Sequence, residues 1–257
     1  MRRVCVAGLA LLFAVASAAA EPLPADDDAC QVPAELRGLQ ANLPHTAAAV
    51  RAMGELIVVA LGSSSTVGVG ASRPEKAYPA QLADVLQRAW PDLAITVRNA
   101  GIGGETTDQM LGRLDGDVLV HQPHLVIWQM GSNGQTEDRD IAAHGEFLRR
   151  GIARMTAAGA DIVLMDPQYA PRLLRKARFK DIVDGIAAVA AETQVGLLRR
   201  FEIMRYWVQG GRLALGELIV SDQLHMSDVG YTCIARILAE GIVRATAVAD
   251  DLAITAP

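Results

Sequence analysis

The sequence has 257 residues, of which 51% are hydrophobic and 21% are charged, and its formal net charge is −5. This length allows one large domain with a well-buried core, and the composition is that of a globular protein rather than a disordered chain. Because Lys and Arg form no block, the charge pattern argues against a protein that binds nucleic acid, and we expect no nucleic-acid partner.

The first 20 residues have the layout of a secretory signal peptide. MRR supplies a positive start, VCVAGLALLFAVA an apolar stretch and ASAAA small residues, which predicts cleavage after Ala18 or Ala20 and export to the periplasm or the extracellular space. The apolar stretch is shorter than the roughly 20 residues that span a bilayer, so we expect no stable membrane anchor after cleavage. A retained N-terminal anchor is the alternative.

The chain that follows the signal peptide contains two cysteines, Cys30 and Cys233, because Cys5 lies within the signal. Residues 21–33 are acidic and contain prolines, which predicts a mobile leader before a domain that spans 34–250. In an oxidising compartment the two cysteines either form a disulfide between the N-terminal segment and the last helix or remain separate buried thiols. The sequence leaves both readings open.

Five apolar runs predict strands covered on both faces, because they lack the alternation of polar and apolar residues of a half-exposed strand. They lie at 56–61, 94–99, 125–130, 161–166 and 195–200. One or two short helices are expected within 34–54, and helical periodicity appears at 77–90, 106–120, 141–159 and 179–193. A last helix begins at a cap, Ser227. This order predicts a single α/β domain with a parallel sheet between layers of helices.

Ligands of such sheets bind beyond the carboxyl ends of the strands, so the polar loops there are the places where a site is expected. GSSSTVG, NAGIGGETT and GSNGQT follow the first three strands, and SDQLHMSDVGY precedes the last helix. The first loop is not a P-loop or a dinucleotide fingerprint, since no lysine lies near Gly62 or Gly68 and the glycine spacing is wrong. It is not an α/β-hydrolase elbow either, because Thr66 stands where that motif needs glycine.

Asp222 and His225 lie three residues apart in the loop before the last helix. A carboxylate beside an imidazole can hold its tautomer and stabilise the imidazolium that forms when the ring takes a proton from serine. Asn133 offers a side-chain NH2, and Gly104 offers a backbone N–H that no side chain blocks. Both groups can donate to an oxyanion at the same edge of the sheet.

Together these loops resemble the four sequence blocks of the SGNH hydrolases, the GDSL-like lipase/esterase superfamily. LGSSSTVG, NAGIGGETT, QMGSNGQ and DQLH occur in the order in which that family has Gly-Asp-Ser, a glycine, Gly-x-Asn-Asp and Asp-x-x-His, and they span 57–231. The resemblance implies a flavodoxin-like, three-layer α/β/α domain with a five-stranded parallel sheet. Within the superfamily, the expected subgroup is the one similar to thioesterase I/lysophospholipase.

The resemblance also implies a role for each matching residue. Ser64 matches the nucleophile, His225 the general base and Asp222 its orienting partner. The Ser64 amide, Gly104 and Asn133 match the oxyanion hole, and no metal or organic cofactor is implied.

Three features of the blocks qualify this match. The doublet Gly103–Gly104 leaves the oxyanion glycine ambiguous by one residue. The family aspartate before the nucleophile is Ser63 here, and the one after the oxyanion asparagine is Gly134. Neither replaced position belongs to the triad, so we expect the chemistry to survive, with altered packing of the loops around the site.

Several polar residues are left out of the predicted site. The other histidines lack a partnering motif and are expected at the surface or in structural roles; they are His45, His121, His124 and His144. His121 and His124 flank a proline, which disfavours them as a metal pair. For three residues after the fourth strand, substrate contact and loop packing are equal alternatives; they are Gln168, Tyr169 and Arg172.

The sequence thus predicts a secreted carboxylic ester hydrolase that works through an acyl-enzyme intermediate. Its expected partner is a small-molecule, glycan or lipid acyl ester, and the aromatic content of 4% mildly disfavours a wide carbohydrate-stacking platform. The alternatives are an O-acyltransferase that acts on a polysaccharide with the same triad and a catalytically silent periplasmic binding domain. Acyl chain length and oligomeric state do not follow from the sequence.

Overall fold

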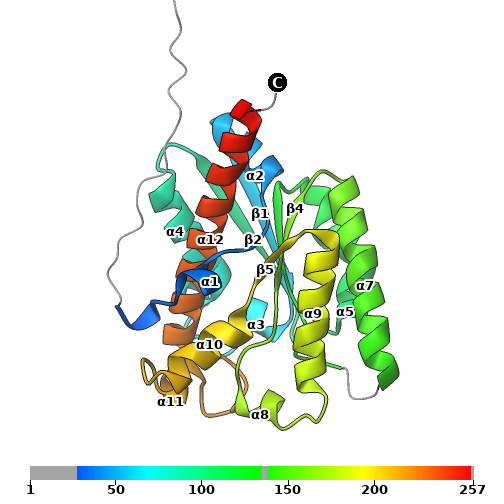
Figure 1. The fold of residues 1–257 in the computed structure, drawn as a ribbon, viewed down its shortest axis with the longest axis vertical. Coiled ribbons are helices and arrows are strands. Elements are labelled where there is room, and N and C mark those ends of the chain that lie inside the picture. Colours follow the sequence, from blue (N-terminus) through cyan, green and yellow to red (C-terminus); the bar gives the residue numbers. More distant parts are fainter. Residues whose placement is uncertain (1–27, 135–137, 256–257) are drawn as a thin grey trace, which may run out of the picture.

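The computed structural model of the protein describes residues 28–134 and 138–255 (Figure 1). The expected signal peptide and residues 21–27 of the expected leader lie outside these residues. Five parallel strands form one sheet in the order β2-β1-β3-β4-β5. They are β1 (Glu55–Gly62), β2 (Ala94–Gly101), β3 (Leu125–Gln129), β4 (Asp161–Met165) and β5 (Gly196–Leu198). The predicted α/β domain with a five-stranded parallel sheet is confirmed.

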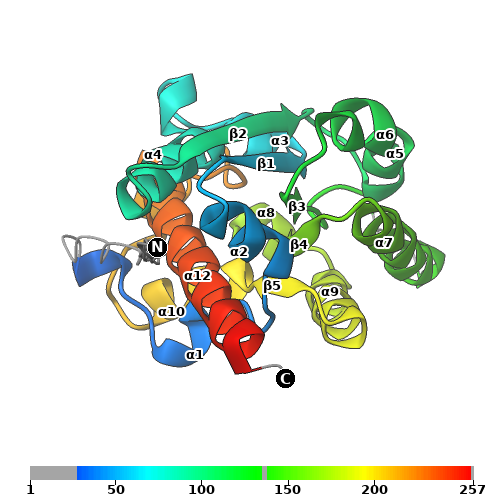
Figure 2. The same cartoon turned by 90° about the horizontal axis from the view of Figure 1, so that it is seen from above.

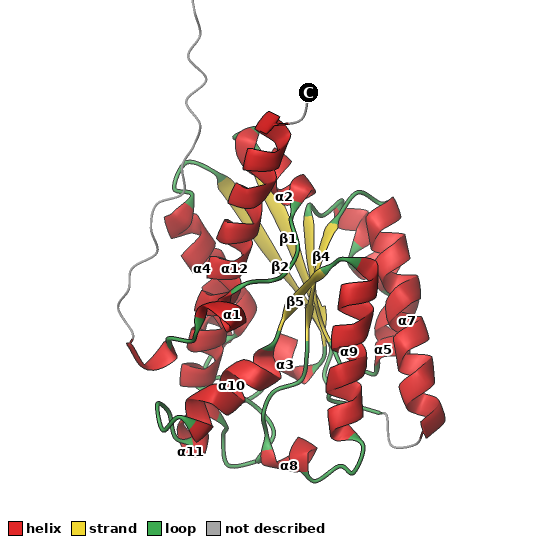
Figure 3. Ribbon diagram, viewed as in Figure 1, coloured by secondary structure: helices red, strands yellow, loops and turns green. Residues whose placement is uncertain are grey.

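Helices cover both faces of the sheet, which gives the expected three layers (Figure 2). On one face lie α1 (Ala34–Arg37), α2 (Pro44–Arg51), α4 (Tyr78–Ala89), α10 (Arg200–Gln209) and α12 (Asp228–Thr255). On the other face lie α5 (Thr107–Gly112), α6 (Leu114–Asp117), α7 (Asp138–Ala157) and α9 (Phe179–Thr193). Short helices occupy the loops at the carboxyl edge; they are α3 (Ser64–Val67), α8 (Pro171–Leu174) and α11 (Leu215–Leu218) (Figure 3).

Strands β1, β3, β4 and β5 are mostly apolar because successive side chains enter two different hydrophobic cores. In β2, at one edge of the sheet, every residue is half-buried or exposed, so the prediction that this strand is covered on both faces is wrong. In β1, Val58 and Ala60 belong to the core beneath α4 and α12, whereas Val59 and Leu61 belong to the core beneath α5 and α7. Successive side chains of a strand point to opposite faces of the sheet. A strand with a core on each side therefore has no solvent-exposed face that would favour polar residues. This burial explains why these four strands were predictable from apolar runs.

Two of the predicted elements are wrong in part. The strand predicted at 195–200 ends at Leu198, and Arg200 begins α10, which the sequence did not reveal. The segment 106–120, predicted as one helix, is broken into α5, α6 and a 3-10 turn. The break lies at Arg113, whose backbone leaves the helical conformation. Its guanidinium donates to the carbonyl of Ala100 at 2.8 Å, at the end of β2, and this contact favours the break.

The last helix is anchored at its start as its sequence predicted. Ser227 Oγ accepts the Gly230 N–H at 3.2 Å, a hydrogen bond from the third helical residue that satisfies a first-turn amide. Four apolar residues one or two turns apart are buried; they are Ile234, Ile237, Leu238 and Ile242. The helix therefore packs firmly along α4, and it begins only three residues after His225.

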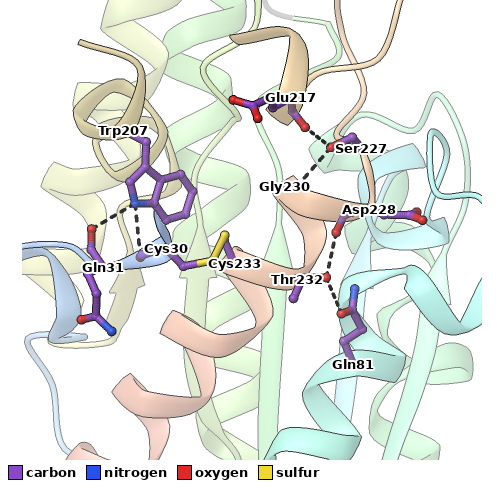
Figure 4. The surroundings of a disulfide bond; sticks show 10 residues. All are labelled: Cys30, Gln31, Gln81, Trp207, Glu217, Ser227, Asp228, Gly230, Thr232 and Cys233. Carbon is purple, nitrogen blue, oxygen red and sulfur yellow. Dashed lines mark hydrogen bonds between the residues drawn. A yellow bond between two sulfur atoms is a disulfide. The ribbon is translucent and has the colours of Figure 1, made fainter. Parts of the chain in front are cut away.

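A disulfide joins Cys30 to Cys233, so that the start of the described chain is bound to α12 (Figure 4). Both cysteines are buried, and their Cα atoms are 5.2 Å apart. The fully buried indole of Trp207 donates a hydrogen bond to the Cys30 carbonyl, at 3.2 Å. Of the two readings left open by the sequence, the structure contains the bridged one.

We expect the double variant Cys30→Ala/Cys233→Ala to lose about 2–4 kcal/mol of unfolding free energy, because the bridge closes a loop across 203 residues of sequence separation. Denaturant unfolding of a chain without residues 1–20 measures this loss. Reductant should destabilise the unmutated chain by a similar amount and leave the double variant unchanged. Two free thiols in the unreduced, unfolded protein would contradict the bridge.

Among the described residues, no helix combines the length and the apolar character needed to cross a membrane.

Candidate active site

The first polar loop is a tight turn from β1 into α3, and Ser64 is the first helical residue. Gly62 is required before the turn, because a Cβ there would lie 2.1 Å from Thr66 Oγ1. The hydroxyl of Ser64 is not used as a helix cap; it lies 2.8 Å from His225 Nε2. Its backbone N–H belongs to the first turn of α3, where amides have no helical acceptor. Both groups are therefore available for chemistry at the sheet edge.

His225 and Asp222 continue this hydrogen-bonded chain. His225 Nδ1 lies 2.5 Å from Asp222 Oδ2, while Nε2 faces Ser64. With the proton on Nδ1, donated to the carboxylate, Nε2 is free to accept from the serine hydroxyl. The structure thus brings together the three residues that the sequence assigned to one triad, across 161 residues between Ser64 and His225.

The Asp222 carboxylate is held in its charged form. Partial burial raises its pKa, but hydrogen bonds from the His225 side chain and from the backbone N–H groups of His225 and Leu224 outweigh that effect and bring the pKa below its usual value. Oδ1 accepts the two N–H groups, at 2.8 Å from Leu224 and 3.0 Å from His225. The same carboxylate therefore folds the loop and orients the imidazole.

The two loops expected to supply oxyanion donors are joined to each other. Asn133 Nδ2 donates to the Glu105 carbonyl at 3.0 Å, one residue after Gly104, and its second N–H remains for a ligand. Gly104 has a φ of +81° and is exposed, with nothing within 4 Å of where a Cβ would stand. The glycine is thus favoured by backbone conformation, and its absent side chain leaves the approach open.

Both departures from the family pattern have a local explanation. Ser63 is buried, and its N–H and Oγ both lie near Gln129 Oε1, at 3.0 and 3.2 Å. A carboxylate at this position would face that acceptor oxygen. Gly134 has a φ of +70°, and a Cβ there would lie 3.0 Å from Thr106 Cγ2. These contacts show what each residue packs against here, and the expected change in loop packing relative to the family stays a prediction.

Three residues that the sequence analysis left out of the site hold its loops in place. Gln129, at the end of β3, accepts hydrogen bonds from Ser63 and Thr66 on both sides of Ser64. Arg113 donates to the Gly62 carbonyl at 3.2 Å and pairs with the Glu105 carboxylate, at 2.7 Å. Arg113 thereby connects the loop of the nucleophile with that of Gly104.

Gln168 is the third of these residues, and its buried amide bridges two more loops. It accepts from Ser132 Oγ at 3.2 Å and donates to the Leu224 carbonyl at 2.9 Å. Of the two alternatives left open for it, the structure thus supports loop packing. A polar residue at the end of an apolar strand was the available signal for Gln129, whereas Gln168 lies in the loop three residues after β4.

The other histidines lie away from this chain of hydrogen bonds. His124 Nδ1 accepts the Ile57 N–H at 3.1 Å, so that it connects β1 with the start of β3. His144 is buried on α7, and burial lowers its pKa to about 4. His45 is exposed and His121 half-exposed. The described residues contain no group of three or more His, Cys, Asp or Glu that could hold a metal ion.

Known proteins resemble this chain in sequence and in fold. The model of the non-GDSL lipase-like family matches residues 29–248. An arylesterase of Vibrio mimicus is 28% identical over 198 residues, which cover 77% of this chain and 92% of that protein.

Two solved structures show the same fold. One is a two-domain esterase active on acetylated mannans, with a TM-score of 0.67 and 20% identity; the match covers 82% of this chain and 56% of that one. The other is a lipase/acylhydrolase from Enterococcus faecalis, with a TM-score of 0.61 and 24% identity, covering 74% of this chain and 96% of that one. The present chain spans little more than half of the two-domain esterase.

The fold and these similarities place the protein among the carboxylic ester hydrolases of SGNH type. Within that class, the chain belongs to the non-GDSL lipase-like family. Ser63 stands where the Gly-Asp-Ser block of the GDSL-like enzymes has aspartate, which agrees with assignment to a non-GDSL family.

Proposed function

We propose that the protein hydrolyses acyl esters with Ser64 as nucleophile, His225 as general base and Asp222 as the orienting carboxylate. The observation that carries the proposal is the continuous hydrogen-bonded chain from Ser64 Oγ through both ring nitrogens of His225 to Asp222, at 2.8 and 2.5 Å. A serine hydroxyl is a weak nucleophile by itself, and an adjacent oriented base is what activates it.

In the proposed reaction, Ser64 Oγ attacks the ester carbonyl carbon while its proton moves to His225 Nε2. Asp222 stabilises the resulting imidazolium. The carbonyl oxygen becomes an oxyanion, which the Ser64 and Gly104 amides and the Asn133 NH2 stabilise by hydrogen bonds. His225 then protonates the leaving alcohol, and water activated by the same ring releases the acid from Ser64.

The proposal includes export of the protein and a small acyl ester as substrate. The disulfide between Cys30 and Cys233 supports an oxidising compartment, and the first 20 residues have the pattern of a signal peptide. The arylesterase relative and the structural neighbour active on acetylated mannans support aryl and acetyl esters as the first substrates to try. Because the sequence also resembles the thioesterase I/lysophospholipase subgroup, esters with longer acyl chains are further substrates to try.

Hydrolysis of p-nitrophenyl esters from acetate to dodecanoate by the mature chain tests this function. We expect turnover, with an initial burst of p-nitrophenol stoichiometric with the protein where deacylation is slower than acylation. A rate that falls with chain length indicates acetyl-type substrates, and one that rises indicates lipid-type substrates. Absence of turnover for the whole series would contradict the proposal.

A further inference from the structure

A cluster of three basic residues borders the proposed active site; we call Arg172, Arg175 and Lys176 the basic rim. They lie on α8 and directly after it, in the segment that follows β4 at the carboxyl edge of the sheet (Figure 3). Arg172 and Arg175 are exposed, and Lys176 is half-buried. In a chain whose net charge is −5, such a local excess of positive charge calls for an explanation.

Hydrogen bonds attach the basic rim to the loop that carries Asp222 and His225. The Arg172 N–H donates to the Gln223 carbonyl at 3.0 Å, and Arg175 Nη1 donates to Gln223 Oε1, also at 3.0 Å. Gln223 directly follows Asp222 and lies two residues before His225. The position of the rim is therefore fixed relative to the general base.

The same segment is attached to the oxyanion loop on its other side. Lys176 Nζ donates to the Ser132 carbonyl at 3.0 Å, and Ser132 directly precedes Asn133. The buried Gln168 amide connects Ser132 with Leu224 beneath the rim. The basic rim is thus attached both to the loop that carries Asn133 and to the loop that carries His225.

The charges of the rim are not neutralised by protein carboxylates. In the described ranges, none of its three members forms an ion pair, and the oxygens they contact belong to neutral carbonyl and amide groups. The next two cations along the chain are paired, Arg178 with Asp181 and Lys180 with Asp184. Burial and, to a smaller extent, the nearby charge of Arg172 lower the pKa of Lys176.

We propose that the basic rim binds an anionic group of the substrate, a carboxylate or a phosphate, and so selects acyl esters that carry a negative charge close to the scissile bond. The inference rests on the proposed ester hydrolysis. Guanidinium and ammonium groups are the side chains that proteins use to bind both anions. A bound anion would supply the counter-charge that the protein itself does not provide at this place.

Matched pairs of neutral and anionic esters test the proposal. On the alcohol side, 4-acetoxybenzamide is compared with 4-acetoxybenzoate and 4-acetoxyphenyl phosphate; on the acyl side, p-nitrophenyl hexanoate is compared with mono-p-nitrophenyl adipate. Each rate is divided by the uncatalysed rate of the same ester. We expect a higher kcat/KM for at least one anionic ester than for its neutral partner, and this advantage should shrink with added salt.

The variant Arg172→Gln removes one charge of the rim and keeps the backbone N–H that binds Gln223. It should lower kcat/KM for the preferred anionic ester about threefold to fivefold, mainly through KM, and change that of the neutral ester less than twofold. Lys180→Gln, which removes an equal charge from the paired site on α9, should change neither. Whether the preferred ester carries its charge on the alcohol or on the acyl part shows which part binds to the rim. Comparison of the benzoate with the phosphate shows which anion the rim binds better.

Two results separate failure of this inference from failure of the proposed function. Equal rates for neutral and anionic esters, or equal effects of Arg172→Gln on both, would overturn the basic rim as a substrate site while ester hydrolysis stands. Absence of turnover for every ester, neutral ones included, would overturn the proposed function itself.

Discussion

Replacement of Ser64 by alanine is expected to lower kcat for p-nitrophenyl esters about 10⁴-fold or more, because His225 would have no hydroxyl from which to take a proton and no acyl-enzyme could form. The Ser64 side chain is half-exposed, so the fold should keep its stability. Steady-state kinetics combined with thermal unfolding measures both effects on the same samples.

The neighbouring serine provides a matched control. Ser65 Oγ is buried and has no hydrogen-bond partner among the described residues, so Ser65→Ala removes no interaction and should retain most of the activity. If Ser64→Ala kept the rate of the unmutated chain, or if Ser65→Ala lost activity as fully without unfolding, Ser64 would not be the nucleophile.

The variant Asp222→Asn should lower kcat about 10³- to 10⁴-fold with little loss of stability. An asparagine oxygen can still accept the N–H groups of Leu224 and His225, which Oδ1 now binds, so the loop should remain folded. Its NH2 group would instead face His225 Nδ1, which then has to be the acceptor. The ring proton is thereby moved to Nε2, where it prevents the imidazole from taking the serine proton.

Asp228→Asn is the control for this variant. Asp228 lies six residues further along and accepts from the N–H and Oγ of Ser72, at 2.8 and 2.6 Å, away from His225. We expect it to change kcat less than threefold, since it contacts neither the ring nor Ser64. Full activity in Asp222→Asn, measured across the pH range in which the chain is folded, would contradict the orienting role of Asp222.

Four of the five strands were predictable because burial on both faces leaves a signal in consecutive residues, whereas β2 lacks that burial. Val58 and Val59 enter different cores, yet both are apolar, so the run is continuous in the sequence. The end of β5 was not predictable in this way, since Arg200 resembles the polar end of a strand. In the structure it is fully buried, with Nε bound to the Asp166 carbonyl at 2.9 Å, and such a pairing depends on the tertiary fold.

The candidate site was predictable where its residues are close in sequence or follow strands. Asp222 and His225 lie three residues apart, so their hydrogen bond could be predicted from the local sequence. Ser64, the other partner of His225, is 161 residues away, and its assignment came from the resemblance. The supporting contacts of Gln129 and Arg113 were missed, because they depend on which strands are neighbours. The sequence alone does not state that β3 lies next to β1.

Labelling with a fluorophosphonate probe tests the central claim, that Ser64 is a nucleophile activated by His225, most directly. Such probes phosphonylate activated serines, and mass spectrometry of the digested protein locates the adduct. We expect one adduct per chain, on Ser64, and none in Ser64→Ala. An adduct on another residue with Ser64 unmodified, or an unlabelled protein that still hydrolyses esters, would contradict the account.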